Sequence, residues 1–279
     1  MKAKKFRCKV FFLCIPGLCG FLLFYLIPFF KSLWYAFIND IYHKEFVWLR
    51  NFQTILENRY FQLALKNTVI FSVVGVTLLL LLSFFLALGL STVVKKTHFF
   101  KNAFLLPMLL PTISVIFAWQ KVFDSDLYFS WMKSGTGIIE ALPVYVLYIW
   151  KNTGMNVLLL TAAFTGLSED VLEAAELDGA RGWKRLRYIT FPLIAPTLFF
   201  VWILSFVNSM KIFKESFLFF ESGYPPDAAY TIQYYMNNHF QKLNYHNLAC
   251  ASTIVALLIG ALIFVIYRIQ NRIMKDVNL

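Results

Sequence analysis

Two sets of mostly polar side chains recur at helical spacing inside strongly apolar segments, and their polar members are suited to contact a polar solute. The sets are Tyr148, Lys151, Asn152 and Met155 in one segment, and Ser205, Asn208, Ser209 and Ile212 in another. A spacing of i, i+3, i+4 and i+7 places each set on one face of a helix. Hydroxyl, amide and ammonium groups in a membrane line an aqueous cavity or join neighbouring helices. The residues alone fit both interpretations.

The sequence lacks the motifs of nucleotide-dependent and hydrolytic enzymes. No G-x-x-x-x-G-K-[ST] loop is present to hold ATP phosphates, and neither G-x-S-x-G nor H-E-x-x-H occurs. The 4 cysteines form no C-x-x-C pair and the 4 histidines are scattered, so neither a disulfide framework nor a zinc site is predicted. We therefore expect no catalytic residue, metal or cofactor in this chain.

A charged segment, residues 168–190, separates two long apolar segments. Ser168 followed by two acids indicates a capped helix start, and good helix formers continue to Leu177. Gly179 and Gly182 then interrupt the pattern before a second short, basic helix. Two short helices joined by a glycine bend can dock into a cleft of a soluble protein. The alternative is a solvated loop on the positively charged side of a membrane.

The composition is that of an integral membrane protein. Hydrophobic residues make up 59% of the 279 residues, charged residues make up 15%, and the mean hydropathy is +0.63. A bilayer is crossed by about 20 apolar residues. We therefore predict one all-α domain, residues 1–279, with a retained first helix. Its six membrane-spanning helices are expected at residues 10–30, 68–93, 104–123, 144–164, 192–215 and 248–267.

Basic residues predict the orientation of these helices. The net charge of +11 accompanies lysines and arginines that flank apolar segments rather than an aromatic platform, so the predicted partner is the lipid bilayer and not nucleic acid. Basic clusters before the first helix, after the second, in residues 168–190 and after the last all fall on one side if there are six spans. That side is predicted to be cytoplasmic, and both termini with it.

The charged segment also resembles a known family. Glu173-Ala-Ala, Gly179, Ile189 and Pro192 reproduce the E-A-A-x3-G-x9-I-x-L-P signature of permease subunits of bacterial ABC importers, with Phe191 in place of leucine. Further matches, such as Ala64-Leu-Lys-Asn-Thr68, resemble the first permease of maltose and glycerol-3-phosphate type systems. The stretch Glu221-Ser-Gly-Tyr-Pro-Pro226 departs from the family's T-x-G-G-P pattern.

The resemblance implies a type I importer permease in the bacterial cell membrane, which imports a sugar or a related solute. Segment 168–190 is then the coupling helix that seats in an ATPase subunit, and Pro192 opens the next membrane helix. The implied docking residues are Glu173, Ala174, Ala175, Asp178, Gly179 and Ala180. The two polar sets occupy the helices where maltose-type permeases contact sugar.

The resemblance also implies partners for this chain. They are a second, related permease, two ATPase subunits that bind ATP and Mg, and an external solute-binding protein. Other solute classes (glycerol phosphate, a peptide or an anion) and a non-transporting membrane scaffold that docks an ATPase are the alternatives.

Overall fold

The chain is helical, as the composition predicts. The structure, a computed structural model, describes residues 14–39, 45–93, 104, 106–107, 109–123 and 137–277. Within that part, extended pairing is limited to one isolated bridge between Ile38 and Phe46. The helices are η1 (Leu22–Leu26), α2 (Ile27–Tyr35), α3 (Arg50–Glu57), α4 (Arg59–Val93), α6 (Thr112–Phe123), α8 (Ile138–Thr165), α9 (Glu169–Leu177), α10 (Trp183–Arg185), η2 (Leu186–Thr190), α11 (Phe191–Ser209), α12 (Phe213–Phe220), η3 (Asp227–Ala229), α13 (Ile232–Gln241) and α14 (Tyr245–Val277).

Helices coincide with the predicted spans, although their lengths differ. Four in the described part are long and apolar enough to cross a bilayer: Cys14–Tyr35, Arg59–Ser91, Trp183–Phe220 and Tyr245–Arg272. Helix α8 meets the criterion together with α9, from which a 66° bend separates it. The third predicted span is represented by α6 and a few residues before it, and the basic stretches 1–13 and 94–103 lie outside the described residues. The six-span topology therefore stays a prediction.

The chain forms two compact units, residues 1–61 with 236–257 and residues 62–235 with 258–279. In the first unit a buried amide fixes the turn that follows α2. The Asn51 Nδ2 donates to the carbonyl oxygens of Ala36 (3.1 Å) and Ile38 (2.8 Å). The buried Cys250 thiol lies 3.3 Å from the same Ala36 oxygen. This turn thus has its polar groups satisfied by neighbouring side chains.

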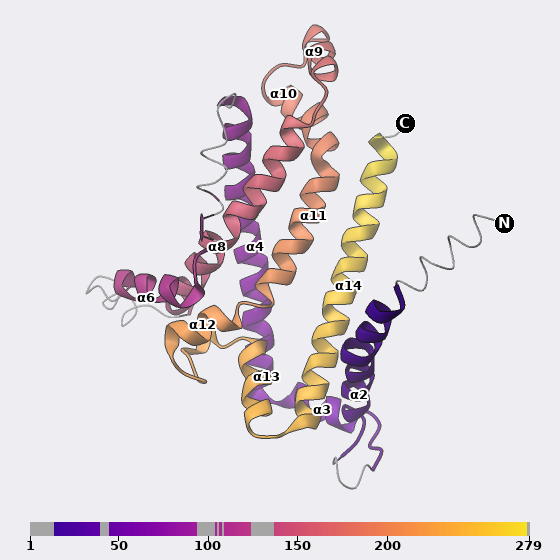
Figure 1. Cartoon of the computed structure of the whole chain (residues 1–279), viewed down its shortest axis with the longest axis vertical. Helices are drawn as coiled ribbons and strands as arrows, with labels where there is room; N and C mark the ends of the chain where they lie inside the picture. Colours follow the sequence, from indigo (N-terminus) through magenta and orange to yellow (C-terminus); the bar gives the residue numbers. More distant parts are fainter. Residues whose placement is uncertain are drawn as a thin grey trace, which may run out of the picture. The chain divides into compact units, whose positions relative to one another are not determined.

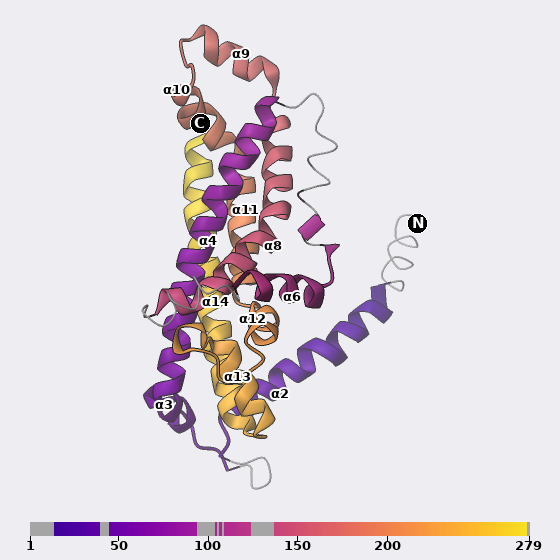
Figure 2. The same cartoon turned by 90° about the vertical axis from the view of Figure 1, so that its left-hand side faces the viewer.

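The second unit is built on α4, α8 and α11, which run side by side in both views (Figures 1 and 2). One apolar cluster contains Ala87, Leu160, Ile194 and Val201 from these three helices. A second cluster, nearer α12, is centred on aromatic residues such as Phe71 and Tyr148. These helices also expose large apolar side chains, such as Val73 and Phe85 of α4 and Phe200 of α11, as expected of helices in a membrane.

A glycine allows α4 to approach α8 closely. A Cβ added at Gly75 would meet the Tyr148 ring at 3.4 Å and the Tyr145 ring at 3.6 Å. Both rings are buried, so they have little space into which to move. Gly89, in the same helix, has nothing within 4 Å of its would-be Cβ. The two glycines form a matched pair for mutation.

We expect Gly75→Leu to destabilise the protein and Gly75→Ala to be tolerated. A methyl group fits at ordinary contact distance, whereas the longer side chain must displace the Tyr148 ring at a cost of about 1–3 kcal/mol. The thermal unfolding midpoint in detergent is the measurement. Gly89→Leu is the control and should leave the midpoint near the wild-type value. Equal midpoints for Gly75→Leu and Gly89→Leu would contradict the close approach.

The pair Asn67 and Thr68, in the third turn of α4, holds the segment that precedes α13. Asn67 Nδ2 donates to the Tyr230 oxygen at 2.9 Å, and Thr68 Oγ1 accepts from the Ile232 amide at 2.9 Å. Thr68 in turn donates to Ala64. These contacts connect residues more than 160 positions apart, and they give a physical role to the Ala-Leu-Lys-Asn-Thr stretch.

Candidate functional site

A cavity of about 340 Å³ lies against the polar faces of α8 and α11. Its lining residues come from α8, from the end of α11 and from the segment that follows: Lys151, Asn152, Met155, Leu204, Asn208, Lys211, Ile212 and Glu215. The volume falls within the range of about 300–1,000 Å³ that is usual for small-molecule sites. Five of the eight residues that the polar sets predicted are therefore found on one cavity wall.

The other three predicted residues are buried between helices instead. The Tyr148 hydroxyl donates to the Ser205 carbonyl oxygen at 2.6 Å, and Asn156 Nδ2 donates to Ser205 Oγ at 2.8 Å. Ser209 Oγ lies 2.9 Å from Ser72 Oγ of α4. Tyr148, Ser205 and Ser209 are each at most 2% exposed. They join helices, which is the alternative that their polarity left open.

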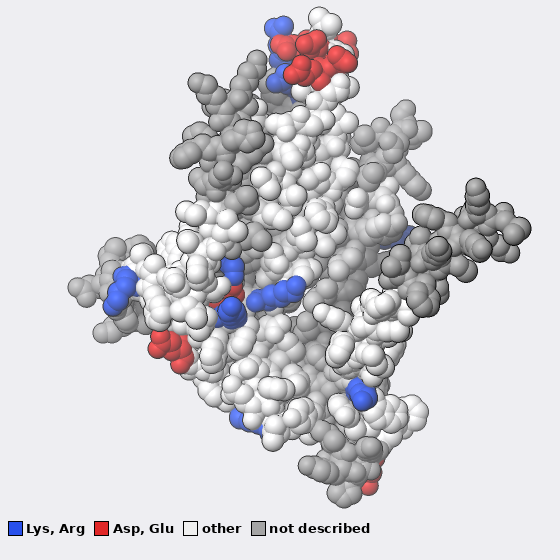
Figure 3. All heavy atoms as spheres, in the orientation of Figure 1, with Lys and Arg blue, Asp and Glu red and all other residues white. Residues whose placement is uncertain are grey.

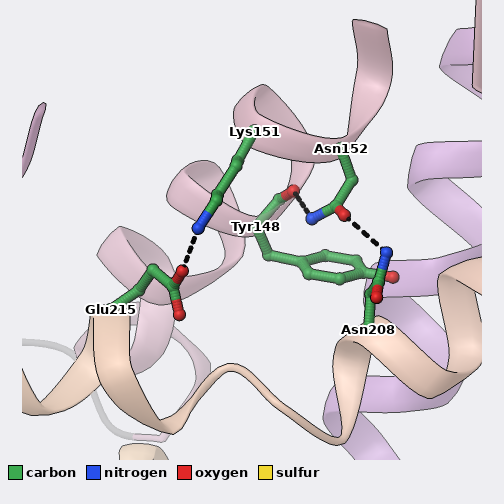
Figure 4. A network of polar contacts seen from close by, with 5 residues as sticks. All are labelled: Tyr148, Lys151, Asn152, Asn208 and Glu215. Atoms are coloured by element: carbon green, nitrogen blue, oxygen red, sulfur yellow. Dashed lines mark hydrogen bonds and ion pairs between the residues drawn. The ribbon is translucent and has the colours of Figure 1, made fainter. Parts of the chain in front are cut away.

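Two amides in the cavity wall connect α8 to α11 (Figure 4). Asn152 Nδ2 donates to the Tyr148 carbonyl oxygen at 2.8 Å, and Asn152 Oδ1 accepts from Asn208 Nδ2 at 3.0 Å. Among the residues that the structure describes, the Oδ1 and the second N–H of Asn208 bond to no other protein group, and Asn208 is exposed. Asn208 is therefore the amide best placed to contact a solute.

Lys151 forms an ion pair with Glu215 of α12, on the side of Tyr148 away from Asn208 (Figure 4). The Lys151 side chain is 35% exposed and the Glu215 side chain only 10%. Sequence reasoning identified Lys151 as an ionisable residue in a span but missed Glu215. A signal was present, because an ammonium group inside a membrane commonly pairs with an acid, and the segment after α11 offers Glu215.

A break between α11 and α12 brings Lys211, Ile212 and Glu215 to the cavity. Helix α11 ends at Ser209 with its last carbonyls bonded by Met210 and Lys211, and Ser216 resumes helical bonding to Ile212 at 3.1 Å. The chain thereby changes direction and carries Lys211 and Glu215 to the cavity. On the viewed face, charged side chains gather midway along a mostly uncharged surface, where α8 meets α12 (Figure 3).

The aromatic residues beside the polar sets pack elsewhere. The Trp150 ring lies 6.0 Å from that of Trp119, and the Phe213 ring lies 5.0 Å from that of Tyr234. Neither Trp150 nor Phe213 lines the 340 Å³ cavity. Its wall therefore offers amides and charges, not an aromatic platform.

At the far end of α8 and α11, residues 168–190 form a helical segment that we call the island (Figure 1). Ser168 occupies the N-cap position of α9 with an extended backbone, although its side chain makes no capping hydrogen bond. Glu169 and Asp170 fill the first turn, where acids interact favourably with the helix dipole. The start of the helix thus depends on these two acids more than on a serine cap.

Two glycines in left-handed backbone conformation separate the two parts of the island. Gly179 has φ +82° and Gly182 has φ +53°, values that favour glycine. Glu176 then spans the bend by pairing with Arg181 at 3.2 Å and with Arg185 at 3.7 Å. Exposed pairs such as these contribute only about 0–1 kcal/mol each. The glycines allow the backbone to bend, and the ion pairs add a small stabilisation to the bent conformation.

The island exposes large apolar side chains. Leu177 is 90% exposed and Trp183 is 72% exposed, at the two ends of the glycine bend. Of the predicted docking residues, Glu173, Ala174, Asp178 and Gly179 are exposed, Ala180 is half-buried and Ala175 is buried. The surface available to a partner is therefore the one with Leu177 and Trp183, and Ala175 contributes to the packing of the island itself.

Pro192 lies in the first turn of α11, and the helix begins before it. Residues Leu186–Thr190 form a π-helical turn, so α10, η2 and α11 follow one another without a gap from Trp183 to Ser209. A proline has no N–H to donate, and neighbouring irregular turns accommodate it. Helix α11 itself begins at Phe191, next to the predicted start at Pro192, and the short helical turns from Trp183 precede it.

Comparison with known proteins agrees with this geometry. Residues 80–278 match the family described as "Binding-protein-dependent transport system inner membrane component". The chain is 27% identical over 280 residues to the trehalose/maltose transport system permease MalF of Thermococcus litoralis, covering 95% of this chain and 94% of that one. It is 30% identical over 232 residues to the sn-glycerol-3-phosphate transport system permease UgpA of Agrobacterium fabrum, covering 78% of each chain.

Solved structures share the fold. A chain of a bacterial alginate ABC transporter in complex with an alginate pentasaccharide-bound periplasmic protein superposes with a TM-score of 0.79 at 21% identity, covering 98% of both chains. The all-α permease fold predicted from the sequence is thereby confirmed. The E-A-A signature and the match over residues 80–278 lead to one conclusion: the chain belongs to the family of binding-protein-dependent transport system inner membrane components, the membrane permeases of ABC importers.

Proposed function

We propose that this permease carries a sugar or a sugar-related solute across the membrane through the cavity formed by α8, α11 and α12. The observation that supports the proposal most directly is the pair Asn152–Asn208, whose amides form part of the cavity wall and are bonded at 3.0 Å. Amide groups offer both donors and acceptors to hydroxyl-rich solutes. The permeases MalF and UgpA, which this chain resembles, are named for trehalose/maltose and sn-glycerol-3-phosphate transport.

The proposed assembly contains this chain, a second related permease, two ATPase subunits and an external solute-binding protein. The chain has no nucleotide-binding loop, so ATP and Mg bind to the ATPases. The island, with Leu177 and Trp183 exposed, is the proposed contact with an ATPase. The proposal also includes a cytoplasmic location for the island and both termini, which the distribution of basic residues supports.

In the proposed mechanism, closure of the ATPases on ATP pulls the island towards the corresponding segment of the second permease and moves the helices around the cavity. The cavity then opens outward, receives solute from the binding protein, and releases it inward after hydrolysis. Such a cycle requires each ligand to bind one conformation better than the other. In this proposal the ATPases bind the island and the solute binds in the cavity, and each favours one conformation of the permease.

Reconstitution of the complete importer in proteoliposomes tests this function. Solute-dependent ATP hydrolysis and uptake should require both permeases, the ATPases and the binding protein together. ATP hydrolysis by this chain alone, or hydrolysis that no solute stimulates, would contradict the proposal and favour a scaffold that docks an ATPase without transport.

Asn208→Ala should raise the KM for solute uptake without affecting assembly with the ATPases. The change removes an exposed amide that contacts Asn152 at 3.0 Å, so we expect the KM for uptake to rise by about fivefold to tenfold, as for a lost hydrogen bond of ~1–1.5 kcal/mol. Ser72→Ala is the control, because this hydroxyl contacts Ser209 away from the cavity wall. Copurification of the ATPases monitors assembly. An unchanged KM in Asn208→Ala would show that α11 does not contact solute.

A further inference from the structure

The charges on the cavity wall do not cancel. Lys151 and Lys211 are basic and Glu215 is acidic, and all three line the cavity. Lys151 and Glu215 neutralise each other as an ion pair. Lys211 is exposed and has no ion-pair partner among the residues that the structure describes. The described wall therefore carries one surplus positive charge, located at the start of the break between α11 and α12.

The cavity wall also offers more free hydrogen-bond donors than acceptors, which likewise favours an anionic ligand. The Asn152 oxygen is occupied by Asn208, and one Glu215 oxygen is occupied by Lys151. Donors remain in excess, because an ammonium group carries three N–H bonds and accepts none. A neutral sugar has hydroxyls that both donate and accept, so it would leave the Lys211 charge uncompensated. A carboxylate or a phosphate group offers acceptors and the opposite charge.

The position of Lys211 also matters. In membrane proteins, lysines are enriched in the loops on the cytoplasmic side. Lys211 instead lies at the end of α11 opposite the island, which is the proposed cytoplasmic end. A charged residue at such a position in a membrane protein usually faces a cavity and marks a ligand path. Lys214, three residues further, is exposed but does not line the cavity. The structure thus separates a cavity lysine from a surface lysine within one short segment.

We infer that the transported solute is a sugar or polyol bearing an anionic group, a carboxylate or a phosphate ester, and that the Lys211 ammonium binds this group. Asn208 contacts a neighbouring oxygen of the solute. The Lys151–Glu215 pair contributes no net charge and holds the wall in place. This inference rests on the proposed import function and assigns its substrate class.

The test uses the complete importer in proteoliposomes and matched probes. Glucuronate is paired with glucose, sn-glycerol 3-phosphate is paired with glycerol, and trehalose is a further uncharged probe. Binding-protein-dependent uptake of at least one anionic probe, without uptake of its uncharged counterpart, is the expected result. Uptake of uncharged probes alone, or of none of the anionic ones, would overturn the inference. Transport of trehalose alone would still support import, whereas ATP hydrolysis unaffected by any solute would count against import itself.

Variants test whether Lys211 is responsible for recognition of the anionic probe. Lys211→Gln should raise the KM for the anionic probe by about tenfold or more, the loss expected for a charge-assisted hydrogen bond. Lys211→Arg should restore most of the affinity, and Lys214→Gln should behave as wild type. Vesicles of phosphatidylcholine alone are compared with vesicles that also contain phosphatidylglycerol. An effect of Lys211→Gln that appears only with the anionic lipid would show that Lys211 binds lipid headgroups, and would overturn the inference.

Discussion

Gly179→Asp is expected to abolish coupling between ATP hydrolysis and uptake while the chain still inserts and folds. A Cβ at this position would meet nothing within 4 Å in the chain itself, so the folded permease has room for the side chain. In the proposed contact with an ATPase, however, the carboxylate would be buried beside Asp178 without a partner. An unpaired buried charge costs several kcal/mol, and about 1.4 kcal/mol already lowers association tenfold.

The backbone at Gly179 requires a second variant. Its φ of +82° strains any other residue, although Asn and Asp tolerate this region best. Gly179→Asn therefore imposes similar strain without the charge, and it should retain more ATPase than Gly179→Asp. Copurification of the ATPase and solute-dependent hydrolysis are the measurements. Wild-type uptake by Gly179→Asp, with its ATPase bound, would show that the island does not dock at this residue.

The second large effect concerns the Lys151–Glu215 ion pair. Removing Lys151 should destabilise the protein more than removing the charge of Glu215. Lys151→Met leaves the nearly buried Glu215 carboxylate unpaired, at a cost of about 3–5 kcal/mol. Glu215→Gln leaves the Lys151 ammonium unpaired, but this group is 35% exposed and can reach water in the cavity. We therefore expect Lys151→Met to lower the thermal unfolding midpoint in detergent more than Glu215→Gln.

The double variant Lys151→Met/Glu215→Leu, compared with Lys151→Met and Glu215→Leu alone, completes this experiment. Replacing both charges by apolar groups removes the uncompensated ion, so the midpoint should recover to near the wild-type value. Lys214→Gln, on the same helix but exposed, is the matched control. Additive losses in the double variant would mean that the two residues are not coupled.

The sequence predicts helical segments and the shared face of each polar set, because both follow from local periodicity. Lys151, Asn152 and Met155 on α8 do lie on one cavity wall. Periodicity does not distinguish Asn208, which faces the cavity, from Ser205, which is buried against Tyr148. That choice depends on how α11 is rotated against α8, a property of tertiary packing.

Glu215 and Lys211 escaped prediction for a different reason. They follow a break in the helix, after which the phase of the helical repeat is lost. The island was easier to predict, since its acids and glycines specify a helix and a bend through local preferences. Ser168 makes no capping hydrogen bond, and helical turns from Trp183 to Thr190 precede α11, so sequence patterns do not fix helix boundaries to the residue.

The two ends of the island are joined to the membrane helices in mechanically different ways. Its entry from α8 is a 66° bend, whereas its exit runs through α10 and η2 into α11 without a gap. At 1.5 Å per residue, the continuous stretch from Trp183 to Ser209 is about 40 Å long. If the island docks as proposed, its displacement would reach Asn208 along this continuous helical stretch, and the bend between α8 and α9 would let the other end of the island pivot.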